Sequence, residues 1–392
     1  MMKRIVVVSL AVMLTLGVMS TVHAANDIPI GGIFDVTGAT GDVGKEYAMA
    51  IKDYIRYVNE NGGINDRQVK LYDVDYQYKI PQAIAAYKKM KARKKIIAVM
   101  GWGTGDTEAM APMMTKDKIP YLSASYSEHL TDANKFPYNF ITATSYSDQA
   151  GVAMEFIKKN WKGKDPAKVC FVFSDTGFGR SPVADGKVWA KKTGLTVVND
   201  QIVGLRALDA TSQLLNMKKD GADFLFMQSS TMSSATVTKD VKKLGIDTKI
   251  ILANWAINEN WLDLVKDAGE GVYSTIPFAV WDDTDIKGVQ LMHELRAKYH
   301  PNLKEKGTCN YTQGFISAIL LCEALKKAGD DLSGPGIKKA LETFRDFDPM
   351  GLSSPVTYTS ESHKPCRSLK IYQVNGGKLT PISDLITLDD KG

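Results

Sequence analysis

The chain has 392 residues, of which 44% are hydrophobic and 24% are charged. These values are ordinary for globular proteins, so they exclude a disordered or collagen-like chain. The formal net charge of +5 is too small and too dispersed to indicate binding to nucleic acid or to an anionic membrane surface. Because single hydrophobic cores stop growing at about 250–300 residues, a chain of this length is predicted to form two lobes.

The N-terminus has the pattern of a secretory signal peptide. Lys3 and Arg4 precede an apolar run over residues 5–19, and small residues follow up to Ala24 and Ala25. The apolar run is interrupted and shorter than the roughly 20 residues that cross a bilayer, which argues against a membrane anchor. We therefore expect residues 1–25 to be removed on export, with cleavage near Ala24 or Ala25.

After the leader, short apolar runs alternate with amphipathic segments. The predicted strands are Ile30 to Phe34, Val69 to Asp75 and Ile96 to Met100, and the predicted helices are Lys45 to Asn59 and Pro81 to Lys95. This alternation is typical of βαβ units, which build a parallel sheet.

The same alternation resumes in the middle of the chain. The predicted strands are Val169 to Phe173, Thr196 to Val203, Phe224 to Met227 and Lys249 to Ala253, and the helices are Arg180 to Lys192, Ala210 to Lys219, Ser234 to Leu244 and Asn258 to Val265. Two such sets predict an α/β protein with two doubly wound parallel sheets. The stretches Asn139 to Ser147 and Tyr273 to Trp281 are predicted to be extended hinge crossings between the lobes.

Loops that follow the strands are expected to converge on one cleft, because open α/β sheets bind ligands beyond the carboxyl ends of their strands. The loop Gly101 to Thr107 is rich in glycine, but its glycines do not have the Gly-x-Gly-x-x-Gly spacing and no phosphate-binding lysine follows them. A nucleotide is therefore not expected. Backbone N–H groups at the start of the next helix suit a carboxylate instead. A plain turn capped by Asp106 or Thr107 is compatible with the same residues.

Hydroxyl and aromatic side chains gather in the other cleft loops. The loop Ser123 to Ser127 carries three serines and Tyr126, which can orient a small ligand that has one polar and one apolar end. Trp102, Phe178, Trp255 and Trp281 lie in or beside predicted cleft loops, with Tyr78 as a weaker candidate. Aromatic residues are more often part of a core, but after strand ends they indicate a binding site.

The sequence lacks a catalytic constellation. The four histidines beyond the leader have no metal-ligand spacing, and there is no Gly-x-Ser-x-Gly elbow and no paired-cysteine zinc motif. We expect no enzymatic activity, no cofactor and no metal, with a hydrolase as a remote alternative.

The four cysteines differ in their settings. Cys170 and Cys322 lie in apolar segments and are expected to be buried thiols, whereas Cys309 and Cys366 lie in turn-like contexts. In the oxidising compartment outside the cytoplasm, a disulfide between Cys309 and Cys366 is a hypothesis, because pairing cannot be read from sequence.

Several motifs together resemble the type I periplasmic binding proteins, in particular the leucine/isoleucine/valine-binding group, over nearly the whole mature chain. The resemblance rests on Ile30 to Phe34 with Thr37, Gly38 and Gly44, on Tyr57 to Asn65, on Asp73 to Tyr76, on Ile119 to Ser123, and on Asp175 to Gly179. The stretch Asn59-Glu60-Asn61-Gly62-Gly63-Ile64-Asn65 is the most specific of these.

The resemblance implies a periplasmic, monomeric receptor of an ABC importer, which closes on a small carboxylate and is recognised by a membrane permease. It also implies a hinge of three chain crossings. The N-lobe is then expected to comprise residues 26–145 and 279–362, and the C-lobe residues 146–278 and 363–392. A sensor subunit that signals to a membrane kinase is an alternative with the same fold.

The resemblance further implies the binding residues. A ligand carboxylate would be held by Thr104, Gly105 and Asp106 together with Ser125, Tyr126 and Ser127, and Phe178 would cover the ligand. Ser230 stands near a position that holds a tyrosine in relatives. Trp255 stands where amino-acid binders place an acidic residue against the ammonium group, so an aromatic or otherwise apolar acid becomes a serious candidate beside an amino acid.

Overall fold

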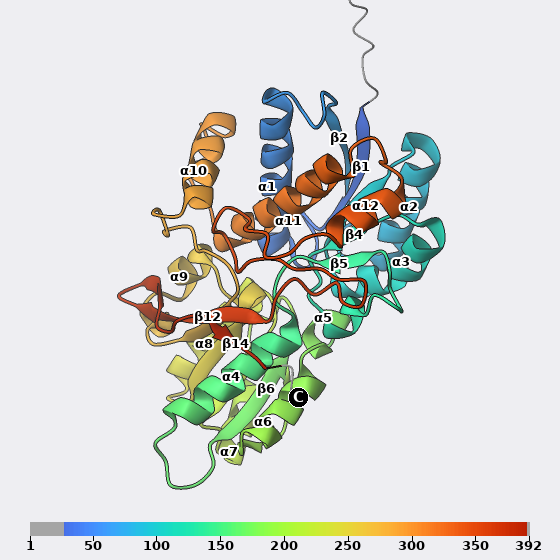
Figure 1. Ribbon diagram of the computed structural model, residues 1–392. Helices are drawn as coiled ribbons and strands as arrows, with labels where there is room; N and C mark the ends of the chain where they lie inside the picture. The colour runs from blue at the N-terminus through green and yellow to red at the C-terminus, as the bar shows by residue number, and fades with distance from the viewer. Residues whose placement is uncertain (1–26, 390–392) are drawn as a thin grey trace, which may run out of the picture.

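The computed structural model describes residues 27–389, so the predicted signal peptide and its cleavage site lie outside the described residues. Two sheets with flanking helices form two lobes, one above the other in Figure 1. This α/β architecture confirms the predicted fold class. We call the part built on the first sheet the N-lobe and the part built on the second sheet the C-lobe. The residue limits given above for the two lobes stay a prediction.

The N-lobe sheet is entirely parallel, with strand order β2-β1-β3-β4-β5. Its strands are β1 (Ile28–Phe34), β2 (Val69–Asp75), β3 (Ala98–Gly101), β4 (Tyr121–Ser123) and β5 (Asn139–Ile141). Its helices are α1 (Gly41–Glu60), α2 (Ile80–Lys94), α3 (Thr104–Asp117), α10 (Lys287–Tyr299), α11 (Cys309–Ala328) and α12 (Gly334–Leu341), with a short 3₁₀ turn η1 (Glu128–Thr131).

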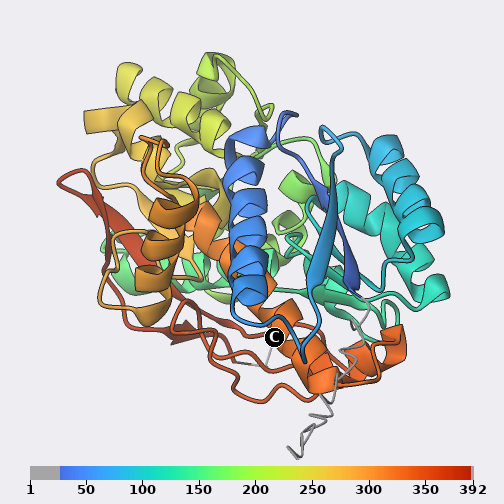
Figure 2. The ribbon, with the colours of Figure 1, turned by 90° about the horizontal axis from the view of Figure 1, so that it is seen from above.

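Helices α1 and α11 cross closely, and Figure 2 shows them side by side. A Cβ atom at Gly314 of α11 would come within 2.2 Å of the carbonyl oxygen of Tyr47 in α1, so only glycine permits this approach. The hydroxyl of Tyr47 also donates to Ser317 Oγ at 3.1 Å. The C-terminal part of the chain is thereby fixed onto the N-lobe.

The C-lobe sheet has the strand order β13-β12-β11-β10-β9-β6-β7, with β8 paired to β6 and β14 paired to β12. Its strands are β6 (Lys168–Phe173), β7 (Thr196–Val197), β8 (Gln201–Ile202), β9 (Phe224–Gln228), β10 (Lys249–Ala253), β11 (Tyr273–Ile276), β12 (Ser368–Asn375), β13 (Lys378–Pro381) and β14 (Ile386–Thr387). Strands β12, β13 and β14 are antiparallel, an edge that the predicted parallel pattern did not include.

The C-lobe helices cover this sheet. They are α4 (Tyr146–Asn160), α5 (Gly177–Arg180), α6 (Val183–Lys192), α7 (Thr211–Asp220), α8 (Thr231–Lys243) and α9 (Glu259–Val265), with 3₁₀ turns η2 (Asn254–Ala256) and η3 (Lys266–Gly269). The single helix predicted over Arg180 to Lys192 is divided between α5 and α6 because Pro182 has no N–H for a continuous helix. The strand predicted over Thr196 to Val203 is likewise divided into β7 and β8.

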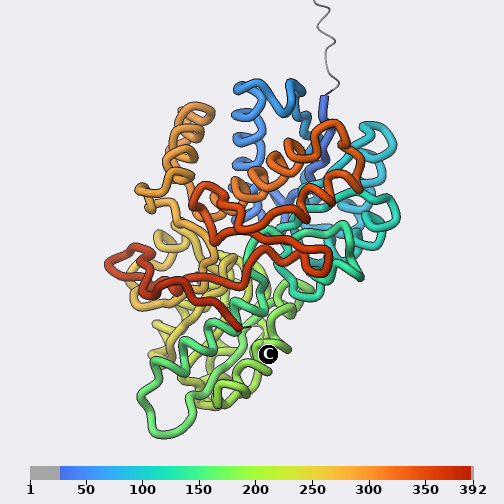
Figure 3. The backbone as a smooth tube through the Cα atoms, in the orientation of Figure 1, coloured from blue at the N-terminus to red at the C-terminus, as the bar shows by residue number. Residues whose placement is uncertain are grey.

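The chain passes between the lobes three times. The first crossing leads from β5 to α4 in the C-lobe, the second from β11 to α10 in the N-lobe, and the third from α12 to β12 in the C-lobe. The third crossing is the red segment in Figure 3. The first crossing is shorter than predicted, because Ser145 caps α4 by accepting from the backbone N–H of Asp148 at 3.1 Å. The carboxyl ends of the parallel strands β3 and β4 in the N-lobe and β9 and β10 in the C-lobe lead into residues that border one region between the lobes.

Candidate functional site

A small cavity lies between the lobes where the strand ends meet. Its walls are formed by residues of both lobes: Thr40, Val43, Tyr78, Trp102, Gly103, Thr104, Ala124, Tyr146, Phe178, Ser230 and Trp255. The cavity volume is about 20 Å³, far below the roughly 300–1,000 Å³ of ligand pockets. The side chains thus nearly fill the site, and a ligand can enter only when the lobes or these side chains move apart.

Direct contacts across the cleft show that the lobes are closed. Arg206 of the C-lobe donates to the carbonyl oxygens of Gly38 and Ala39 in the N-lobe. The backbone N–H of Met232 donates to Asp42 Oδ2 at 3.0 Å, and burial at this contact raises the pKa of the Asp42 carboxyl above its usual value. These contacts can form only in the closed arrangement.

Trp255 is the centre of an aromatic cluster that joins the lobes. Its indole is 4% exposed and lies edge-on to Trp102, with ring centroids 4.9 Å apart. It stacks on Tyr126 at 5.6 Å, and its Nε1–H donates to the hydroxyl of Tyr146 at 2.9 Å. Such offset and edge-on aromatic pairs are favourable beyond their buried area. An apolar or aromatic ligand would find flat, rigid walls here.

The opposite wall is polar and belongs to the start of α3. Gly103 precedes this helix in an extended conformation with no side-chain cap, and the first N–H groups of a helix have no intrahelical partner. The hydroxyl of Ser125 donates to Thr104 Oγ1 at 2.8 Å, and both side chains are buried. Hydroxyls, N–H groups of the first helical turn and the positive end of the helix dipole together suit a carboxylate.

Asp106 lies behind this wall. Its Oδ1 accepts from the hydroxyl of Tyr76 at 2.6 Å, and its Oδ2 has no hydrogen-bond partner among residues 27–389. Burial raises the pKa of Asp106 to about 7 and outweighs the hydrogen bonds from Tyr76 and from backbone N–H groups, which act in the other direction. The carboxyl therefore titrates near neutrality next to Gly103, a residue of the cavity wall.

The structure places most of the predicted site residues in or directly behind the cavity wall. Trp102, Thr104, Phe178, Ser230 and Trp255 line the cavity. Ser125 and Tyr126 contact these lining residues from behind, and Gly105 and Asp106 belong to the first turn of α3. Ser127 instead contacts Ser181 of the C-lobe. Ser230 directly precedes α8, and its hydroxyl donates to the carbonyl oxygen of Leu205 at 2.8 Å.

The sequence analysis did not name Thr40, Val43 and Tyr146 as site residues, although all three line the cavity. Thr40 and Val43 lie at the start of α1, in the loop after the first strand, and that loop was expected to reach the cleft. Tyr146 begins α4, within a stretch that was predicted to be a hinge crossing. Trp281, which was expected near the cleft, lies in the second crossing and packs on Tyr311 and His293 outside the cavity.

Charge is absent from the walls. None of the described residues that line the cavity is acidic, basic or a histidine. Asp175, in the loop after β6, is exposed and pairs with Arg180 at 2.6 Å. A ligand with a positively charged group would therefore find no anionic partner among the lining side chains.

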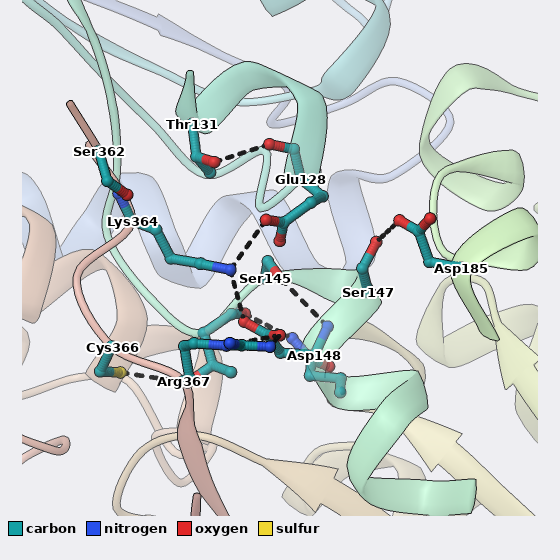
Figure 4. A network of polar contacts seen from close by, with 12 residues as sticks. Glu128, Thr131, Ser145, Ser147, Asp148, Asp185, Ser362, Lys364, Cys366 and Arg367 are labelled. Atoms are coloured by element: carbon teal, nitrogen blue, oxygen red, sulfur yellow. Dashed lines mark hydrogen bonds and ion pairs between the residues drawn. The ribbon is translucent and has the colours of Figure 1, made fainter. Parts of the chain in front are cut away.

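Charged residues concentrate instead at the hinge, as Figure 4 shows. Lys364 of the third crossing pairs with Glu128 in η1 at 2.8 Å and with Asp148 in α4 at 3.1 Å. Arg367 approaches the second carboxylate oxygen of Asp148 at 3.2 Å. The network connects the N-lobe, the C-lobe and the third crossing.

The predicted disulfide between Cys309 and Cys366 is wrong in this structure, where all four cysteines are free. Cys309 begins α11, and its thiol points to the carbonyl oxygen of Ile257 at 3.7 Å. Cys366 lies in the third crossing, where its thiol is 3.2 Å from Thr144 Oγ1. Each thiol thus has its own protein partner, and the turn-like sequence contexts reflected a helix start and a hinge segment.

Within residues 27–389, no group of three or more histidine, cysteine, aspartate or glutamate side chains is arranged to hold a metal ion. No helix in this part of the chain has the length and apolar character that a membrane crossing needs.

Comparison with known proteins gives matches over almost the whole chain. The model of a family described as "Periplasmic binding protein" matches residues 27–378. The Leu/Ile/Val-binding protein homolog 7 of Brucella suis biovar 1 is 22% identical over 87% of this chain and 86% of its own length.

Solved structures match equally widely. A branched-chain amino acid ABC transporter protein from Thermus thermophilus, solved with bound valine, superposes with a TM-score of 0.87 at 26% identity, covering 93% of this chain and 97% of that one. A solute-binding protein of an ABC transporter from Rhodopseudomonas palustris BisB5, in complex with 3,4-dihydroxybenzoic acid, superposes with a TM-score of 0.79 at 20% identity, covering 93% and 99%.

Proposed function

The chain belongs to the periplasmic binding protein family, and we propose that it is the receptor of an ABC importer for a small apolar or aromatic carboxylate without an ammonium group. Proteins of this family bind solutes and are not enzymes, and the same holds for this chain. The proposal concerns which solute it binds.

The family fold accommodates both amino acids and aromatic acids. The relative from Thermus thermophilus was solved with valine, and the protein from Rhodopseudomonas palustris was solved with 3,4-dihydroxybenzoic acid. Because one fold holds both, the ligand class of this chain depends on its own cavity walls.

The observation that carries the proposal is the uncharged wall around Trp255. The resemblance implies that amino-acid binders have an acidic side chain at the position of Trp255. In this chain the position holds an indole, whose N–H already donates to Tyr146. Burying an ammonium group without a charged partner is costly, and a cation over an aromatic face recovers only part of the cost. A carboxylate that lacks the ammonium group avoids that cost.

The rest of the site fits such a ligand. The carboxylate would meet the first N–H groups of α3 and the hydroxyls of Thr104 and Ser125, and the apolar body would lie between Phe178 and Trp255. Binding would shift the population from an open to a closed form, because the ligand contacts both lobes only when they close. The membrane permease would then recognise the closed form.

Matched ligand pairs test the proposal, since each pair differs only by the ammonium group. We would titrate the mature protein in a calorimeter with 3-phenylpropanoate and phenylalanine, and with 4-methylpentanoate and leucine. The acid of at least one pair should bind at least tenfold tighter than its amino acid. Tighter binding of the amino acids, or binding of neither member of either pair, would contradict the proposed ligand class.

A variant separates the two ends of the site. Ser125→Ala removes one hydroxyl of the polar wall and should weaken every carboxylate that binds, whichever pair it belongs to. An unchanged affinity would remove this wall from the binding site.

A further inference from the structure

Tyr146 joins the two walls of the cavity through one hydroxyl group. The oxygen accepts from Trp255 Nε1 at 2.9 Å and donates to the carbonyl oxygen of Ala124 at 3.2 Å. A phenol can accept and donate at once, so both bonds form together. The hydroxyl therefore connects a C-lobe loop to the N-lobe loop after β4.

The backbone of Tyr146 is held by the N-lobe independently of its side chain. Its N–H donates to the carbonyl oxygen of Tyr126 at 2.8 Å, although α4, which it begins, packs on the C-lobe sheet. Trp255 follows β10 and belongs to the C-lobe. When the lobes part, Tyr146 is expected to stay with the loop of Tyr126 while Trp255 moves away.

The ring of Tyr146 also forms part of the cavity wall. It is 1% exposed, lies edge-on to Phe178 with ring centroids 5.5 Å apart, and is tilted against Tyr126 at 5.6 Å. Replacing the residue by phenylalanine would keep these ring contacts and remove only the hydroxyl.

We infer that Tyr146 is a positioning residue, whose hydroxyl fixes the indole of Trp255 in the orientation that closes the cavity over a ligand. This inference rests on the proposed function and concerns how the site closes. In the open form, water can satisfy both the indole N–H and the carbonyl oxygen of Ala124. In the closed form both groups are buried, so loss of the hydroxyl would leave them unsatisfied and would penalise closure specifically.

A double-mutant cycle measures this coupling. We would titrate 3-phenylpropanoate into the wild-type protein, Tyr146→Phe, Trp255→Phe and the double variant. Tyr146→Phe should weaken binding about tenfold in the wild-type background and about threefold in the Trp255→Phe background, where only the carbonyl oxygen of Ala124 loses its partner. Equal losses in both backgrounds, or no loss at all, would overturn the inference.

Tyr87→Phe is the matched control. Tyr87 is fully buried in α2 and its hydroxyl donates to Asp117 at 2.6 Å, away from the cavity wall. This variant loses one phenol hydrogen bond outside the cavity, so it can lower stability, but its affinity should equal that of the wild type. A weakening as large as that of Tyr146→Phe would show that any such loss acts through general stability.

A second measurement needs no ligand, so it remains decisive if 3-phenylpropanoate does not bind and the proposed ligand class fails. Ser127 and Ser181 touch across the cleft, and the S127C/S181C variant can lock the closed form by a disulfide. In the locked, ¹⁵N-labelled protein, Trp255 gives the indole resonance that is lost on Trp255→Phe. Tyr146→Phe should shift this N–H resonance upfield and accelerate its exchange with solvent; an unchanged resonance would refute the inference.

Discussion

Replacing Trp255 by alanine should weaken ligand binding strongly, because much of its burial exists only while the lobes are closed. A tryptophan side chain buries about 150–250 Å², and this one is 4% exposed. Its contacts with Trp102, Tyr126 and Tyr47 lie on the N-lobe side. If about half of its surface is buried by closure, roughly 100 Å² at 25 cal/mol per Å² corresponds to about 2.5 kcal/mol.

The hydrogen bond to Tyr146 contributes about 1 kcal/mol more. The closed form should therefore lose about 3.5 kcal/mol relative to the open form, which is on the order of 300-fold in affinity. Calorimetric titration with 3-phenylpropanoate measures this loss directly.

Trp161→Ala is the control for the loss of a large ring. Trp161 ends α4 and packs on Phe224 within the C-lobe, where closure changes nothing. This variant should bind as the wild type does, even if its melting temperature falls. The reasoning about Trp255 is refuted if Trp255→Ala retains wild-type affinity, or if both variants lose affinity equally.

Three further outcomes test separate parts of the structure. Burial raises the pKa of Asp106 from 3.8 to about 7, so between these pH values the folded protein keeps a proton that the unfolded chain releases. The protonated Asp106 therefore contributes to the unfolding free energy, fully below about pH 4 and progressively less as the pH rises to 7. Thermal unfolding should accordingly show a smaller decline between pH 4 and 7 in Asp106→Asn than in the wild type, and parallel curves would contradict the assignment. Lys364→Met should lower the unfolding free energy in guanidinium by about 1–2 kcal/mol, between the values for exposed and buried ion pairs, because Lys364 is 13% exposed and links two carboxylates; an unchanged midpoint would show that the network is dispensable. Alkylation in denaturant without reductant should add four labels by mass, whereas only two labels would restore the disulfide between Cys309 and Cys366.

Much of the fold could be predicted because the hydrophobic pattern carries it. The strands Val69 to Asp75 and Lys249 to Ala253 have the limits that the pattern indicates, since alternation and polar flanks mark both ends. The apolar segment around Cys322 belongs to helix α11, but the first residues of that helix are mostly buried polar groups that contact other elements, so the pattern did not indicate where it begins. Such tertiary burial leaves no periodic signal in the sequence.

The site was predictable where loops follow strands and unpredictable where the chain crosses between lobes. Trp102 and Trp255 follow β3 and β10, and both line the cavity as expected. Tyr146 begins α4 directly after the first crossing, and its role depends on the distance from its hydroxyl to an indole 109 residues away. Neither that distance nor the free state of Cys366 follows from local pattern.

A crystal structure of the mature protein grown with 3-phenylpropanoate tests the central claim most directly. The account predicts the ligand between closed lobes, with its carboxylate at the N-terminus of α3 beside Thr104 and Ser125 and its ring between Phe178 and Trp255. A ligand bound outside the cleft, or one with its ring at α3 and its carboxylate against Trp255, would contradict it.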